Sequence, residues 1–164
     1  HTDQLAAKLK SDAKKKAAEV LIVHQNREED GIHFLVAYGG GHRAANEADN
    51  SILLRLIDGT VRVLLTGDCE ARCEETVRTT APIQADVLNV GHHGSNASST
   101  PVFLDQVRPK IAVISAGAGN PYGHPTAPVL ARLKARRITI YRTDRDGTII
   151  LHSDGKRFTV EMEK

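Results

Sequence analysis

The stretch that decides the fold is Asp86-Val-Leu-Asn-Val-Gly-His-His-Gly-Ser-Asn96, an apolar run that ends in two adjacent histidines between glycines. A second run, Val61-Arg-Val-Leu-Leu-Thr-Gly-Asp68, ends in a carboxylate directly after a glycine. Open β-sheet enzymes place their chemistry where buried strands end. Neighbouring strands that end in Gly-Asp and Gly-His-His bring carboxylate oxygen and imidazole nitrogen together, which is a donor set typical of divalent metal sites.

The composition is that of one folded domain. The chain has 164 residues, of which 40% are hydrophobic and 26% charged, so it can bury a core. No apolar stretch approaches the roughly 20 residues of a membrane-spanning helix and no secretory signal opens the chain, so we expect no direct membrane insertion of this segment. The net charge of +2 is too small to establish nucleic-acid binding. A lysine cluster is read as a solvated helix face in preference to a phosphate-contacting patch: Lys8, Lys10, Lys14, Lys15 and Lys16.

Hydrophobic periodicity predicts alternating strands and helices. Ser51–Ile57 and Val61–Thr66 form the clearest hairpin, joined through Asp58-Gly59. The alternation that follows favours a mixed sheet with helices packed on one face. The other predicted elements are a helix at 5–16, strands at 20–24 and 32–36 around a turn at 26–31, a polar loop at 39–50, helix 70–79, strand 86–90, helix 100–107, strand 111–115, helix 126–136, strand 138–141 and a final hairpin of 148–152 with 157–160.

Cys69 and Cys73 lie four residues apart at the expected start of a helix, a spacing that shares one helix face. They lack the further Cys or His pairs of a structural zinc motif. We interpret them as packing residues or incidental surface thiols and infer no redox compartment from them.

Asp68, His92 and His93 each have two interpretations. Asp68 alone is typical of a helix N-cap, because the glutamates that follow suit an early helix. With Gly-His-His-Gly downstream it becomes a metal candidate. The two histidines are adjacent, so on an extended strand they point to opposite sides and serve different roles. The alternative is a pair of hydrogen-bonded loop histidines.

The polar loop after the histidines is a candidate phosphate contact. Ser95 and Asn96 belong to it, together with Ser98-Ser99, and could bind phosphate oxygens through hydroxyls and backbone amides. For Ser99 or Thr100, a helix N-cap before Pro101 is the equal alternative.

His124 is the best candidate general acid in the sequence. It stands in Tyr-Gly-His-Pro after the predicted strand 111–115, and imidazole titrates near neutral pH. A structural hydrogen-bonding role is the alternative. Tyr122 and Asp144 are further substrate-binding candidates. We expect Asp68, His93 and His124 to gather at one edge of a sheet made of strands 51–57, 61–66, 86–90, 111–115 and 138–141.

A series of short motifs between Asn50 and Gly155 is specific in its order and spacing. The motifs are Asn50-Ser-Ile-Leu-Leu54, Leu64-Leu-Thr-Gly-Asp68, 86–95, Ser99, Phe103-Leu104, Arg108-Pro109, Ala112-Val-Ile-Ser115, Asn120-Pro-Tyr-Gly-His-Pro125, Tyr141-Arg-Thr-Asp144 and Gly147. Together they resemble a metallo-β-lactamase-fold domain, most closely the soluble C-terminal domain of the ComEC family of competence proteins. The resemblance implies an α/β (α+β) fold, the metallo-β-lactamase-like αββα sandwich, of which residues 1–164 are a single domain and mainly the C-terminal half.

The resemblance also implies roles for individual residues. The aspartate that matches Asp68 bridges two metal ions in the family. His93 is assigned to metal and His92 to the substrate phosphate or its transition-state charge, although the two histidines are interchangeable at this point. His124 or His92 assists the leaving oxygen. Arg142 and Arg145 either hold flanking phosphates or are ordinary surface charges.

The N-terminus departs from the family pattern. Such hydrolases carry a His-x-His/Asp-x-Asp-His signature that supplies most metal ligands. His1 and Asp3 match its start and are metal candidates, whereas Leu5-Ala6 stand where Asp-His is expected. Asn50 lies near the place of another family histidine and is a poorer metal ligand, so we count it among substrate-binding candidates. We therefore expect a fragment that lacks its N-terminal half, binds metal weakly or not at all, and has doubtful activity by itself.

For the parent protein the resemblance implies a metal-dependent phosphodiesterase or nuclease domain that degrades the DNA strand that is not transported. Two divalent ions, manganese or zinc, are the implied cofactors, because imidazole ligands suit these metals. The implied partners are DNA and the membrane-channel part of the same protein. The implied location is the extracytoplasmic face of a bacterial cell membrane, as a soluble domain of a membrane protein.

Two other functions remain open. One is a hydrolase of the same fold that acts on a small phosphodiester, such as a phosphorylcholine ester, or on a lactone. The other is a metal-free binding module. Metal content separates enzyme from binding module, and the length of the preferred substrate separates nuclease from small esterase.

Overall fold

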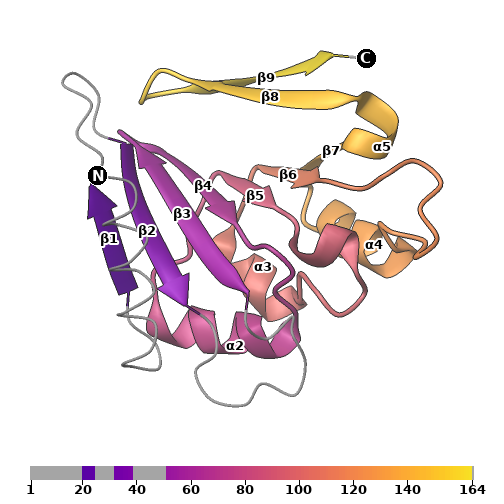
Figure 1. The fold of residues 1–164 in the computed structure, drawn as a ribbon, viewed down its shortest axis with the longest axis horizontal. Helices are drawn as coiled ribbons and strands as arrows, with labels where there is room; N and C mark the ends of the chain where they lie inside the picture. The colour runs from indigo at the N-terminus through magenta and orange to yellow at the C-terminus, as the bar shows by residue number, and fades with distance from the viewer. Residues whose placement is uncertain (1–19, 25–31, 39–50, 164) are drawn as a thin grey trace, which may run out of the picture.

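A seven-stranded mixed sheet forms the centre of the molecule (Figure 1). The computed structural model describes residues 20–24, 32–38 and 51–163. Neighbours in the sheet are neighbours in the chain: β1 (Val20–His24), β2 (Ile32–Tyr38), β3 (Ile52–Asp58), β4 (Val61–Leu65), β5 (Val87–Asn89), β6 (Ile111–Ile114) and β7 (Thr139–Arg142). Strands β1 to β4 pair antiparallel, and β4 to β7 pair parallel. The architecture is mixed α/β, and the prediction that five named strands share one sheet is confirmed.

Three helices cover one face of the sheet, as expected: α2 (Ala71–Thr80), α3 (Pro101–Val107) and α4 (Ala127–Ala135) (Figure 1). The period-2 alternation of the strands buries one set of side chains against them. From the strands come Leu53, Leu64 and Leu88, and from the helices come Val77, Phe103 and others of the same buried cluster. Parallel strands joined by helices place the carboxyl ends of β4, β5, β6 and β7 at one edge of the sheet.

A separate hairpin, β8 (Thr148–Ser153) with β9 (Phe158–Glu163), lies over the opposite face (Figure 1). Its tip is bonded to the β3–β4 turn. The Thr60 N–H donates to the Gly155 carbonyl at 2.7 Å, and the Ser153 hydroxyl donates to Asp58 at 2.6 Å. A Cβ at Gly59 would lie 2.2 Å from the Gly155 oxygen, so only glycine allows this close approach.

The bounds of most other predicted elements differ from the structure by one or two residues. β9 extends three residues beyond its predicted end, and the four-residue helix α5 (Thr143–Asp146) was not expected. The predicted helix 5–16, turn 26–31, loop 39–50 and lysine cluster lie outside the described residues. No helix among the described residues is long and apolar enough to cross a membrane.

Helices α2 and α3 are joined through a buried carboxylate. Glu74 is 2% exposed, and its two oxygens accept hydrogen bonds from the backbone N–H groups of Ser99 and, at 2.9 Å, Thr100. Thr100 is the N-cap of α3, and its own hydroxyl accepts from the Phe103 N–H. Burial raises the pKa of Glu74, while the hydrogen bonds from Thr100 and Ser99 act in the opposite direction. Glu74 therefore satisfies donors at a helix start that is closed to water.

We expect Glu74→Ala to lower the free energy of unfolding by about 3 kcal/mol, because it leaves one buried and one half-buried N–H group without an acceptor. Urea denaturation of the variant and the parent measures the difference. Glu75→Ala is the matched control: Glu75 pairs with Arg78 on the exposed side of the same helix, and its removal should cost less than about 1 kcal/mol. Equal losses for the two variants would contradict the assignment.

Candidate functional site

Polar side chains follow three neighbouring parallel strands at the same edge of the sheet. Asp68 follows β4, His92 and His93 follow β5, and His124 lies in the loop after β6. The His93 Nε2 and Asp68 Oδ1 atoms are 3.7 Å apart, and the His92 and His124 ring centroids are 5.8 Å apart. His93 and His124 line one cavity. The expected gathering of Asp68, His93 and His124 is thus what the structure shows.

The two histidines lie on a tight turn. Residues 91–94 form a 3-10 turn in which His92 (φ 48°, ψ 46°) and His93 (φ 54°, ψ 20°) both have left-handed backbone angles. The extended backbone considered for the two histidines is wrong, because β5 ends at Asn89 and the chain then turns. Glycine is required on both sides: a Cβ at Gly91 would lie 2.6 Å from the Cys69 oxygen, and one at Gly94 would lie 2.6 Å from the Pro125 Cβ. Consecutive non-glycine residues in this region store strain, which is a feature of functional sites.

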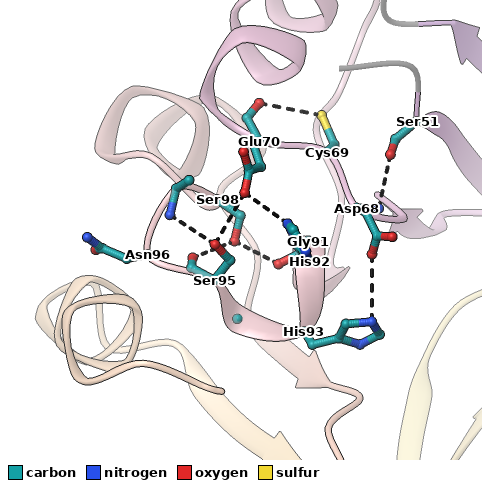
Figure 2. Close-up of polar contacts among 12 residues, drawn as sticks. Ser51, Asp68, Cys69, Glu70, Gly91, His92, His93, Ser95, Asn96 and Ser98 are labelled. Atoms are coloured by element: carbon teal, nitrogen blue, oxygen red, sulfur yellow. Dashed lines mark hydrogen bonds and ion pairs between the residues drawn. The ribbon is translucent and has the colours of Figure 1, made fainter. Parts of the chain in front are cut away.

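His93 has a defined tautomer. Its Nδ1 lies 2.7 Å from the Ser115 carbonyl oxygen, which can only accept, so the neutral ring carries its proton on Nδ1. Nε2 is then an acceptor that faces a carboxylate oxygen at 3.7 Å, too far for a hydrogen bond (Figure 2). Two opposed acceptors suit a cation or a proton between them.

Asp68 is not a helix N-cap. That position in α2 belongs to Glu70, and the Asp68 N–H instead donates to the Ser51 hydroxyl at 3.1 Å. The side chains of Asp68 and His93 are 55% and 57% exposed, which leaves both accessible to further ligands. Among the described residues no group of three or more His, Cys, Asp or Glu is arranged to hold a metal. Asp68 and His93 thus offer two donors, whereas zinc sites use three or four protein ligands. The candidates His1 and Asp3 lie outside the described residues.

His92 pairs with an acid that the sequence did not reveal. Its Nδ1 lies 2.8 Å from Glu70 Oε1, and the Ser95 hydroxyl donates to the same oxygen at 3.3 Å (Figure 2). A carboxylate that accepts from Nδ1–H leaves Nε2 as the unprotonated nitrogen of the neutral ring. The only sequence signal was an acid two residues after Asp68, and helix propensity explained it equally well. His92 and His93 therefore have separate partners, as expected, although the turn and not a strand separates them.

A disulfide joins Cys69 and Cys73 beside this pair. Both residues are buried in the core, at 0% and 1% exposure. Their burial agrees with the packing interpretation, the surface-thiol interpretation is wrong, and the disulfide itself was not expected from the sequence. The bond ties the loop that carries Asp68 and Glu70 to the first turn of α2.

His124 belongs to a loop that one side chain holds in place. The Asn120 amide accepts from the His124 N–H at 3.0 Å and donates to the His124 carbonyl at 2.6 Å and the Gly117 carbonyl at 2.9 Å. Burial lowers the pKa of His124, His92 and His93 lower it further, and Glu70 opposes them. The neutral ring therefore predominates at pH 7. The cavity beside it has a volume of about 400 Å³ and is lined by His93, Ser115, Ala116, Gly117, Asn120, Tyr122, His124 and Thr143.

Other predicted residues hold the structure together. Asn96 accepts from Arg132 of α4 and lies away from His93 (Figure 2). The buried Ser98 hydroxyl donates to the Gly91 carbonyl at 2.7 Å. Of the two N-cap alternatives the structure selects Thr100, since Ser99 has a left-handed backbone before the helix.

The acids and arginines after β7 pair with one another. Arg142 donates to both oxygens of Asp144, at 2.9 and 2.5 Å, and lowers the pKa of that carboxyl. Arg145 donates to Asp146, whose pKa falls to about 2. Both arginines are thus engaged by carboxylates, and Asp144 is held in an ion pair. Asn50 lies outside the described residues.

We expect the neutral ring of His92 to carry its proton on Nδ1, because Glu70 accepts there. Nitrogen-15 NMR of the ring should show this tautomer, and Glu70→Ala should shift the ring toward the Nε2–H form. Glu75→Ala, which removes a glutamate from the exposed face of α2, should leave the spectrum unchanged. A ring that keeps the Nδ1–H form in Glu70→Ala would show that Glu70 does not set the tautomer.

No protein-family model matches the chain. Among characterised proteins it is similar to ComE operon protein 3 of Bacillus subtilis (strain 168), with 44% identity over 106 residues, which is 64% of this chain and 14% of that protein. It is 36% identical over 127 residues to Competence protein ComA of Neisseria gonorrhoeae, covering 76% of this chain and 18% of that protein.

A further relative is Recombination protein 2 of Haemophilus influenzae, which is 36% identical over 137 residues, 82% of this chain and 17% of that protein. The chain thus spans between 14% and 18% of the length of these relatives. Their names point to a family of competence and DNA-uptake proteins.

Proposed function

We propose that the chain is part of a metal-dependent phosphodiesterase domain, with the metallo-β-lactamase fold, in a competence DNA-uptake protein, where it degrades the strand that is not transported. The observation that carries the proposal is the pair of opposed acceptors, Asp68 Oδ1 and His93 Nε2 at 3.7 Å, at the carboxyl ends of parallel strands. Metal–ligand bonds are about 2 Å long, so two acceptors at this separation can bind one divalent ion between them.

The donor set fits a divalent metal. Carboxylate oxygen and neutral imidazole nitrogen suit manganese and zinc, and the Ser115 carbonyl behind Nδ1 is the kind of outer hydrogen bond that orients a ligating histidine. Asp68 and His93 would hold the metal, and His1 and Asp3 are proposed to complete the ligand set. Divalent ions bound there would polarise the phosphoryl group and activate water for attack.

The remaining histidines suit proton transfer and charge stabilisation. The centroid of the His92 ring lies 6.3 Å from that of His93 and 5.8 Å from that of His124, so two further imidazoles lie near the Asp68–His93 pair. His92, oriented by Glu70, is proposed to contact the phosphate, and His124 to protonate the leaving oxygen. Because the pKa of His124 is lowered, this acid role draws on the minor protonated form at neutral pH.

The location of the domain is proposed to be the extracytoplasmic face of the membrane, next to the channel part of the same protein. The disulfide between Cys69 and Cys73 supports this, because disulfides persist in oxidising compartments and are rare in the cytosol. A small phosphodiester is the second candidate substrate, since a cavity of about 400 Å³ is within the range of small-molecule sites.

We expect Asp68→Ala to abolish metal-dependent cleavage of linear DNA and to lower metal content, because it removes the carboxylate placed to serve the ions. Elemental analysis and a cleavage assay on the longer parent protein measure the two effects separately. Asp105→Asn, on the exposed side of α3, is the control and should change neither. Cleavage by Asp68→Ala at the parent rate would refute the proposed role.

We expect His124→Ala to retain metal and to slow turnover by roughly 100-fold, the contribution typical of a general acid. The same two measurements test it. Loss of metal from this variant would place His124 among the ligands instead.

A further inference from the structure

Tyr122 is unusually exposed for a large aromatic side chain. It is 78% exposed, and in the described part of the chain it is the only aromatic among the exposed large hydrophobic residues, which otherwise are Ile52, Val102 and Met162. The face of such a ring stays in contact with water until a flat apolar group covers it.

The ring stands at the cavity that also contains His93 and His124. The Tyr122 and His124 ring centroids are 6.0 Å apart, with an angle of 31° between the ring planes. None of the described residues that line the cavity is a carboxylate, and several are small or carry hydroxyls. The surroundings thus admit an anionic group at the imidazoles and a flat group against the tyrosine.

The backbone of the loop that carries Tyr122 is held by hydrogen bonds. The Asn120 side chain bonds to the backbone of both His124 and Gly117, which brackets Tyr122 between two anchored residues. A loop whose backbone is already ordered binds a ligand with a smaller entropic cost than a mobile one.

We propose that Tyr122 is a stacking platform for one unpaired nucleobase of the substrate, and that the site therefore takes single-stranded polynucleotide in preference to duplex. The inference rests on the proposed phosphodiesterase function. Bases stack on aromatic side chains irrespective of sequence. A cavity of about 400 Å³ lies at the lower end of ligand sites and suits a single nucleotide. In a duplex, by contrast, each base is already stacked and paired.

Steady-state kinetics on single-stranded oligonucleotides test the platform. Tyr122→Ala should raise KM by about 10-fold to 100-fold, the loss of one stacked base, and leave kcat within about twofold. Tyr122→Phe keeps the ring and should behave as the parent. Val102→Ala, an equally simple truncation of an exposed side chain on α3, is the control for surface effects. A fall in kcat with unchanged KM would overturn the proposal, as would equal kcat/KM on single-stranded and duplex DNA.

Substrates that lack one base isolate the stacking contact. An abasic nucleotide is placed in turn at each position beside the cleaved bond. At one position it should weaken substrate binding by the unsubstituted protein and leave binding by Tyr122→Ala unaffected, because that variant already lacks the stacking contact. Equal losses for the two proteins at every position would overturn the platform.

A binding measurement separates this inference from the proposed activity. If the unsubstituted protein cleaves no DNA, the proposed function fails. Fluorescence anisotropy with a labelled oligothymidine, in the presence of a chelator, then tests by itself whether Tyr122 stacks on a base. The stacking role is supported if the unsubstituted protein binds the intact oligonucleotide more tightly than the abasic one and Tyr122→Ala shows no such difference. Equal affinities, or no binding of either, overturn it.

Discussion

The left-handed turn at His92 and His93 is the constraint on which the site depends. Two consecutive non-glycine residues in this region cost on the order of 1–3 kcal/mol each. The His92 N–H donates to the Gly67 carbonyl at 2.9 Å, and the Gly94 carbonyl accepts from the Thr126 N–H at 3.0 Å. The turn is therefore held from the end of β4 and from the start of α4. These contacts direct the two rings to different partners.

Local patterns predicted the elements well, because strand alternation and helix periodicity depend on neighbours in sequence. The Gly-Asp and Gly-His-His endings predicted that Asp68 and His93 meet, since parallel strands end at a common edge. The contacts of Glu70 with His92 and of Glu74 with the start of α3 cross more than twenty residues. No periodicity encodes such pairings, and each acid suited an ordinary helix equally well.

The carboxylates near the site divide into two kinds. Glu70 and Asp144 accept short hydrogen bonds from His92 and Arg142 and are therefore committed to positioning those side chains. Among the described residues the Asp68 side chain makes the 3.7 Å contact with His93 and no hydrogen bond, and more than half of it is exposed. Its charge is therefore not committed to a structural hydrogen bond within this part of the chain, which is why it carries the proposed metal role.

The Cys69–Cys73 bond has a consequence for the motion of the site. The two cysteines have a sequence separation of only 4. The bond therefore restricts local opening of the folded chain more than it restricts the conformations of the unfolded chain. The first turn of a helix is ordinarily among the first parts to fray. With this cross-link in the core, the backbone between the two cysteines opens only together with the residues that pack around it. Glu70 is inside that loop, so the same bond limits the motion of the carboxylate that orients His92.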